Sequence, residues 1–169
     1  MKNRAFTLVE LLVVVLIIGI LAAIAVPQYQ KAVMKANLHK GIPLVESLYQ
    51  AQQAYYLANG DFATDIDDLD LTIPKDESCK KTQTTATSYY SCSFGIIGMW
   101  NNFTNMQYIT TNGSLAYLHF LRDLPDHSMK EGEVWCFAKP NNTNAQGVCL
   151  SEGGSLQDEN AYWKLYKIR

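Results

Sequence analysis

The feature that most constrains this chain is an uncharged apolar run near its amino end. No residue between Glu10 and Lys31 is charged, and residues 11–26 are all Leu, Val, Ile, Ala or Gly. As an α-helix, residues 6–26 would be about 30 Å long, which matches the hydrocarbon thickness of a bilayer. The run predicts a membrane-spanning helix, and a chain of 169 residues leaves room for one compact domain beyond it.

Three details distinguish this run from an ordinary signal peptide. The small residue Ala5 precedes the run, so cleavage after it would leave the apolar stretch on the mature protein. Glu10 lies inside the apolar segment, where a carboxylate needs a partner. Pro27 follows the run directly and can kink a helix without ending it. A signal anchor with one stray acid is the alternative interpretation.

These residues resemble the amino-terminal signature of type IV pilins and of the related pseudopilins of type II secretion. The resemblance is carried by a short basic leader at residues 1–5, Phe6 as the first mature residue, Glu10 in FTLVE, Gly19 within the run, and Pro27 after ILAAIAV. It covers the amino end of the chain.

The resemblance implies a processing step and an assembly contact. A dedicated aspartyl peptidase would cut between Ala5 and Phe6, and the new amino terminus of Phe6 would be methylated. Ala5 stands where the family usually has Gly, and it is small enough that cleavage is expected. Glu10 would pair with the amine of Phe6 on a neighbouring subunit, because a buried carboxylate is tolerable only when it is paired.

Residues 28–59 continue with a helical pattern. Apolar or small residues recur at three- and four-residue steps, which is typical of a half-buried amphipathic helix. Gly41-Ile42-Pro43 interrupts the pattern, so we expect a second bend or a short break there in addition to a kink at Pro27. Asn59-Gly60 predicts the end of the helix.

The remaining residues favour β-structure. Apolar and aromatic residues alternate or gather in four segments, and Asn112-Gly113 between two of the expected strands is the strongest hairpin signal. The segments start near Tyr90 and Leu115 and span residues 133–139 and 161–168. We therefore predict an α+β fold, in which the second half of a long helix packs on an antiparallel sheet of about four strands, as in pilin heads.

The expected organisation has four parts. They are a leader at 1–5, a transmembrane or filament-core helix at 6–27, an amphipathic continuation at 28–59, and a soluble head with two disulfides at 60–169.

Four cysteines in an exported chain suggest two disulfides and an oxidising compartment. Three pairings are possible in principle. We favour Cys79–Cys92 and Cys136–Cys149, because each closes a short loop worth about 3 kcal/mol in the chain-entropy model. The second loop also resembles the carboxyl-terminal disulfide loop of type IV pilins. A zinc site is disfavoured because no Cys-x-x-Cys occurs.

An acidic cluster follows the helix. Asp65, Asp67, Asp68 and Asp70 are weak calcium candidates, and some pseudopilins bind calcium. The spacing fails the EF-hand pattern, since Asp70 stands where Gly is needed. We favour a cap formed by Thr64 with Asp67 at the start of a helical turn, and expect no metal.

Other function classes find little support. Removal of Lys2 and Arg4 with the leader leaves twelve basic and sixteen acidic residues, so no basic footprint for nucleic acid remains. His39, His119 and His127 stand apart in the sequence, and neither a nucleophile motif nor a Gly-rich phosphate loop is present. We expect no enzyme activity and no cofactor.

The resemblance predicts a structural subunit of a type IV pilus. The subunit would be stored in the bacterial inner membrane with its head in the periplasm, and would polymerise through residues 6–57 into a surface filament. Its partners would be copies of itself and other pilins, the prepilin peptidase, the inner-membrane assembly platform and a motor ATPase. The alternatives are a type II secretion pseudopilin and, less favoured, a signal-anchored periplasmic enzyme or binding protein.

Overall fold

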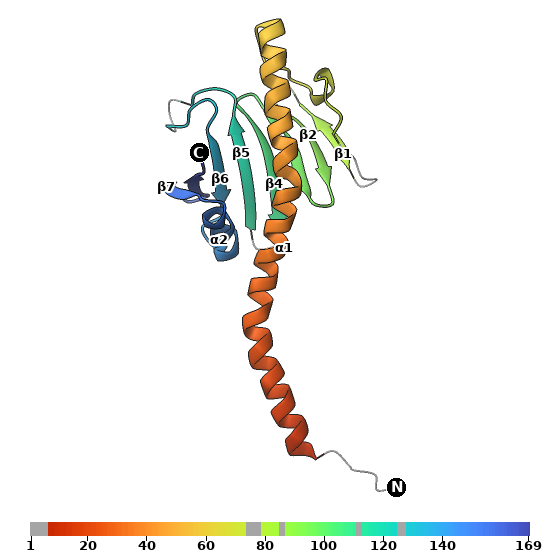
Figure 1. The fold of residues 1–169 in the computed structure, drawn as a ribbon, viewed down its shortest axis with the longest axis vertical. Coiled ribbons are helices and arrows are strands. Elements are labelled where there is room, and N and C mark those ends of the chain that lie inside the picture. Colours follow the sequence, from red (N-terminus) through yellow and green to blue (C-terminus); the bar gives the residue numbers. More distant parts are fainter. Residues whose placement is uncertain (1–6, 74–78, 85–86, 111–112, 125–127) are drawn as a thin grey trace.

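The computed structural model describes residues 7–73, 79–84, 87–110, 113–124 and 128–169. A long helix carries a sheet on its upper half, while its lower half projects away from the head (Figure 1). The elements are α1 (Leu8–Asn59), the 3-10 turn η1 (Ile66–Asp68), β1 (Lys80–Gln83), β2 (Thr87–Cys92), β3 (Gly95–Trp100), β4 (Phe103–Thr110), β5 (Gly113–Phe120), β6 (Val134–Ala138), α2 (Thr143–Ser151), β7 (Ser155–Glu159) and β8 (Lys164–Lys167).

Helix α1 is one continuous element of 52 residues. At 1.5 Å per residue it is about 80 Å long. It ends where Gly60 adopts a left-handed conformation, with φ of 79°, and donates its N–H to the carbonyl of Tyr56. This is the usual Gly chemistry at a helix carboxyl end.

We predicted a second bend or a short break at Gly41-Ile42-Pro43, and the break is wrong, because α1 runs through it. Gly41 is buried against β4, and a Cβ on it would lie 2.4 Å from Cγ of Met106. Glycine therefore permits a close approach of helix and sheet. Pro43 lies on the exposed side, and the fully buried side chains of Leu38 and Val45 hold the flanking turns against the sheet.

The sheet has eight strands in the order β1-β2-β3-β4-β5-β6-β8-β7, and each neighbouring pair is antiparallel. The α+β class is confirmed, but the sheet is larger than the four strands expected. The alternation that starts at Tyr90 spans two strands, β2 and β3, joined by a short turn, after which β3 begins at Gly95 with φ of 145°. The edge strands β1 and β7 are mostly exposed and so lack an apolar alternation.

The β4–β5 hairpin is confirmed. Its register runs from Phe103 opposite Phe120 to Thr110 opposite Gly113. Asn112, which belongs to the predicted turn, lies outside the described residues.

Apolar side chains cover both faces of the central strands. The face toward α1 forms the main core with one side of the helix. Its members include Met34, Leu38, Val45 and Leu48 of α1 and Ile97, Met99, Met106, Leu115 and Tyr117 of the sheet. The face away from α1, here called the outer face, carries a second cluster. Its buried members are Ala116, Leu118, Phe120, Met129, Trp135 and Leu165.

Helix α2 lies in the part of the chain for which only β-structure was predicted. Asn142 caps the helix, because its Oδ1 accepts a hydrogen bond from the N–H of Ala145 at 3.0 Å. Asparagine is favoured both at helix N-caps and in turns, so the residue type alone did not distinguish a helix start from a loop.

Candidate assembly site

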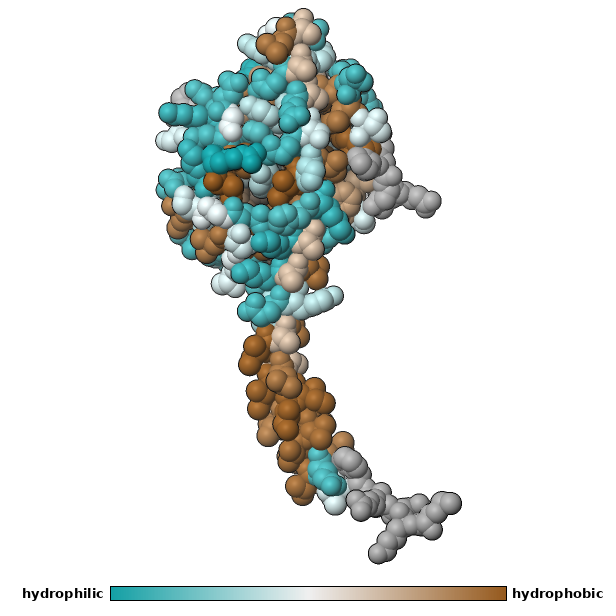
Figure 2. All heavy atoms as spheres, viewed as in Figure 1, coloured by the Kyte–Doolittle hydropathy of each residue, from teal (hydrophilic) through white to brown (hydrophobic). Residues whose placement is uncertain are grey.

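The lower half of α1 is a largely apolar rod that projects below the head. Residues 7–30 are all exposed, and Leu8 keeps 78% of its accessible surface. Figure 2 shows this rod as a mostly apolar surface, with a hydrophilic patch near its lower tip, below a largely hydrophilic face of the head. The helix contains a stretch long and apolar enough to cross a membrane. A patch of this size marks a surface that lipid or protein covers.

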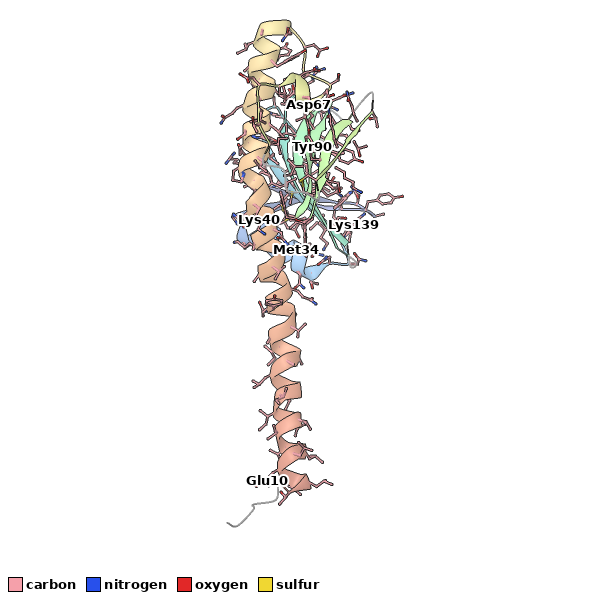
Figure 3. The ribbon with its side chains drawn as sticks, turned by 90° about the vertical axis from the view of Figure 1, so that its right-hand side faces the viewer. Glu10, Met34, Lys40, Asp67, Tyr90 and Lys139 are labelled. Carbon is pink, nitrogen blue, oxygen red and sulfur yellow. A yellow bond between two sulfur atoms is a disulfide. The ribbon has the colours of Figure 1, made fainter. Side chains whose placement is uncertain are left out.

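Glu10 lies in the first turn of α1, at the lower tip of the rod (Figure 3). Its Oε2 accepts hydrogen bonds from the backbone N–H and the hydroxyl of Thr7, both at 2.8 Å. In return, Thr7 Oγ1 accepts a hydrogen bond from the N–H of Glu10 at 3.2 Å. This reciprocal pair is a capping box.

The cap gives Glu10 a role within one chain that sequence reasoning missed, although Thr7 three residues before Glu10 is the usual signal. The carboxylate remains exposed in the capped state, so the cap leaves it accessible to a second chain. Ala5 and Phe6, which the sequence assigns to cleavage and methylation, lie outside the described residues.

Pro27 and Pro43 both lie inside α1, at exposed positions. Each removes one backbone N–H from the helical ladder. Figure 1 shows α1 changing direction below the sheet.

Contacts between α1 and α2 fix the head on the helix just above the rod. Glu152 Oε1 lies 3.0 Å from Lys35 Nζ and 3.0 Å from His39 Nε2. Burial of the Glu152 carboxyl opposes its ionisation, but the hydrogen bonds from Lys35 and then His39 hold its pKa below the usual value. Gln30 accepts a longer hydrogen bond from Asn144 at 3.5 Å.

Two disulfides occur, Cys79–Cys92 and Cys136–Cys149, which is the sequential pairing. Cys136 and Cys149 are fully buried and tie α2 to β6. This bridge therefore also supports the contact between α2 and α1.

The acidic cluster is organised around Lys81 of β1. Its Nζ lies 2.5 Å from Asp65 and 2.7 Å from Asp67. Hydrogen bonds to Asp65 and Asp67 raise the pKa of Lys81, and hydrogen bonds from Lys81 and Tyr90 lower the pKa of Asp67. Lys81 supplies the cation for this pair, while Asp68 and Asp70 are exposed.

The predicted cap at Thr64 is wrong. Asp65 caps η1 by accepting the N–H of Asp67 at 3.1 Å. Across the described part of the chain, no group of three or more His, Cys, Asp or Glu residues could hold a metal ion.

His119 has close neighbours that its isolation in the sequence did not reveal. Tyr49 of α1 stacks on its ring at 3.5 Å between centroids, and Glu46 Oε2 lies 3.3 Å from its Nδ1. Burial lowers the pKa of His119 despite the opposing charge of Glu46. These contacts attach β5 to the upper half of α1.

Comparisons with known proteins match two parts of the chain. Residues 1–26 match the prokaryotic N-terminal methylation motif, and residues 40–119 match the family described as type IV pilin-like G and H.

Several pilins are similar over a shared segment. The fimbrial protein of Neisseria meningitidis serogroup B is 42% identical over 60 residues, which is 36% of this chain and 35% of the relative. The type IV major pilin protein PilA of Myxococcus xanthus is 41% identical over 68 residues, or 38% of this chain and 31% of the relative. PilE1 of Neisseria gonorrhoeae is 44% identical over 58 residues, or 34% and 35%.

The chain thus spans about a third of the length of these curated relatives. No solved structure matches it. The methylation motif at the amino end, the pilin-like region and the long apolar helix on an antiparallel sheet agree with one another. The chain therefore resembles the type IV pilins, in its amino-terminal methylation motif and in the pilin-like region at 40–119.

Proposed function

We propose that this chain is the structural subunit of a type IV pilus. The observation that carries the proposal is the rod of residues 7–30, which is exposed throughout and apolar over residues 11–26. Lipid covers such a rod when it spans a bilayer, and neighbouring helices cover it when copies associate. A subunit that first spans the bilayer and then joins a filament with these rods at its core would have its rod covered in both states.

The proposed life of the subunit has two stages. The first is a single-pass protein of the bacterial inner membrane, with residues 6–27 as the anchor, residues 28–59 supporting the sheet, and the head at 60–169 in the periplasm. A prepilin peptidase removes residues 1–5 after Ala5, and Phe6 is methylated. The inner-membrane assembly platform and a motor ATPase then move the subunit into a surface filament of copies of itself and other pilins.

Glu10 directs assembly in this proposal. An unpaired carboxylate in the membrane is costly, so pairing it with the Phe6 amine of a neighbouring subunit favours the filament over free diffusion. The capping box offers a competing explanation, in which Glu10 only starts the helix.

Three variants separate these two explanations. Glu10→Ala removes both charge and cap, Glu10→Gln keeps an acceptor oxygen but no charge, and Thr7→Ala removes only the cap hydroxyl. We expect both Glu10 variants to be absent from sheared surface filaments while their heads stay folded, and Thr7→Ala to assemble. Normal assembly of Glu10→Gln would contradict the charge pairing.

The relatives named above are pilins and a fimbrial protein, which favours a pilus over the pseudopilus of a type II secretion system. Deletion of the gene separates the two. Loss of surface filaments with unchanged protein secretion supports the pilus, and the reverse result supports the pseudopilus.

A further inference from the structure

The outer face of the sheet contains a hollow of about 460 Å³. Figure 3 shows α1 along one side of the sheet and Lys139 on the side away from it. The hollow is of the size usual for small-ligand sites, which enclose roughly 300–1,000 Å³. It is separate from the rod and from the contacts that join α1 to the head.

Aromatic rings line the hollow from two sides. Trp100, Phe103 and Phe120 occupy consecutive cross-strand positions on β3, β4 and β5. Their ring centroids are 5.6 Å and 5.5 Å apart. On the other side, Phe137 of β6 packs against Trp163 at 6.2 Å. The pair Asn105 and Leu118 lies between these two groups of rings, because Phe103 and Phe120 lie to one side of it along the strands and Phe137, opposite Ala116, lies to the other.

The floor of the hollow holds an unpaired acceptor. Asn105 of β4 lines the hollow and is only 4% exposed, yet its Oδ1 is buried without a hydrogen-bond partner. Buried polar side chains nearly always have a partner, so each exception needs an explanation. A bound ligand with an O–H or N–H group could donate the hydrogen bond that Asn105 Oδ1 lacks. Ala116, which faces Gln107 diagonally across from Asn105, also lines the hollow and is small.

The charges at the rim restrict the ligand. Lys139 Nζ lies 4.3 Å from the ring centroid of Trp163 and 5.8 Å from that of Tyr162, so a cationic ligand would meet an ammonium group. Asp158 also lines the hollow and would repel an anion. A quaternary ammonium lacks the donor that Asn105 needs, and a hydrocarbon lacks it as well.

We propose that this hollow binds a neutral sugar ring, such as a hexose residue of a glycan. A pyranose has a C–H face that lies flat on an aromatic ring, and hydroxyl groups that donate to Asn105 Oδ1 and to the Asp158 carboxylate. Because the hollow and α1 lie on opposite sides of the sheet, covering α1 in a filament does not by itself close it. This site goes beyond the role as a filament subunit.

The test uses the full chain in a detergent that has no sugar headgroup. Methyl α-glucopyranoside, methyl α-mannopyranoside, methyl β-galactopyranoside and N-acetylglucosamine are titrated separately while tryptophan fluorescence is recorded. We expect at least one sugar to give a saturable change through Trp100 and Trp163. Asn105→Leu and Trp163→Ala should each weaken that affinity at least tenfold, whereas Asn101→Leu, the same change at an exposed position outside the hollow, should not.

Thermal unfolding keeps this test independent of misfolding. Asn105→Leu removes an unpaired buried acceptor and is close in size, so its melting temperature should stay at or above that of the parent chain. Four results would overturn the proposal: no saturable binding of any sugar, unchanged binding in both Asn105→Leu and Trp163→Ala, binding of choline or phosphate in place of sugars, or self-association of the chain that Trp163→Ala abolishes.

Discussion

The two halves of α1 belong to one continuous helix but have opposite surroundings. In residues 8–26 every side chain is exposed, whereas Met34, Leu38, Val45 and Leu48 of the upper half are buried against the sheet. Apart from Glu10, the lower half is apolar on all sides, as expected of a helix that lipid or other apolar helices surround. The upper half has an apolar stripe, which suits a partner on one side. The arrangement of apolar residues, more than their number, therefore distinguishes the half satisfied within the chain from the half that requires lipid or other subunits.

Replacing one leucine in each half of α1 by alanine should give the largest difference in stability between the two halves. Leu48 is fully buried, so Leu48→Ala should lower the free energy of unfolding of the head by about 2–5 kcal/mol. Leu16 is exposed, so Leu16→Ala should change it by less than about 0.5 kcal/mol. Denaturant unfolding of the full chain in detergent, followed by tryptophan fluorescence, measures both. Similar losses in the two variants would contradict the division of α1.

The two disulfides extend the comparison to the support of the upper half. Both join cysteines with a sequence separation of 13, so their loop entropies are alike, at about 3 kcal/mol each. Cys136–Cys149 is buried and ties α2, which contacts α1, to β6, whereas Cys79–Cys92 is partly exposed near the β1 edge. Replacing both cysteines of a bridge by Ser should therefore cost more stability for Cys136–Cys149. Calorimetry of the two double variants checks the order, and a larger loss for Cys79–Cys92 would reverse it.

Two glycines of α1, one in each half, allow a matched pair of substitutions with a smaller expected effect on stability. Gly41→Ala places a Cβ against Met106, and overpacking of this kind costs about 1–3 kcal/mol, partly offset by the helix preference of Ala. A Cβ on Gly19 would meet nothing within 4 Å in the single chain. We expect Gly41→Ala to lower the melting temperature of the head and Gly19→Ala to leave it unchanged. The opposite pattern would mean that α1 does not approach β4 closely.

Acid should loosen the junction between the two halves. The pKa of Glu152 is lowered in the folded chain, so its contribution is present above the ordinary glutamate pKa and is lost as the pH falls through the lower, folded value. For a partly exposed pair this amounts to at most about 1 kcal/mol. The difference in unfolding free energy between Glu152→Gln and the parent chain should shrink as the pH drops below about 4.

Glu159→Gln provides the control, since Glu159 is exposed and lies 3.4 Å from Lys164 at the far edge of the sheet. Its stability difference from the parent should stay near zero at every pH. A constant difference for Glu152→Gln across the same range would show that Lys35 and His39 do not hold this carboxylate.

Local sequence patterns were sufficient for much of the fold. The apolar run at 11–26 predicts the rod, and Asn59-Gly60 and Asn112-Gly113 mark a helix end and a hairpin. The role of Gly41 was not predicted, because it depends on a close approach to Met106, which is distant in the sequence. Helix α2 was missed because Asn142 suits both a cap and a loop.

Contacts between elements could not be predicted from the sequence. The pairing of Thr7 with Glu10 is local and could have been found, whereas Lys35 and His39 meet Glu152 only after α2 packs on α1. The unpaired Oδ1 of Asn105 likewise depends on neighbours from several strands. The full number of strands was not predicted either, because exposed edge strands show little apolar alternation in the sequence.

The most direct test of the account is the identity and amino terminus of the subunit in purified surface filaments. Filaments are sheared from cells, imaged by electron microscopy and analysed by intact-mass and peptide mass spectrometry. The filaments should contain this chain, beginning at N-methylated Phe6. Filaments without it, or a chain that stays in the membrane and still begins at Met1, would contradict the claim that its exposed rod is completed by other subunits.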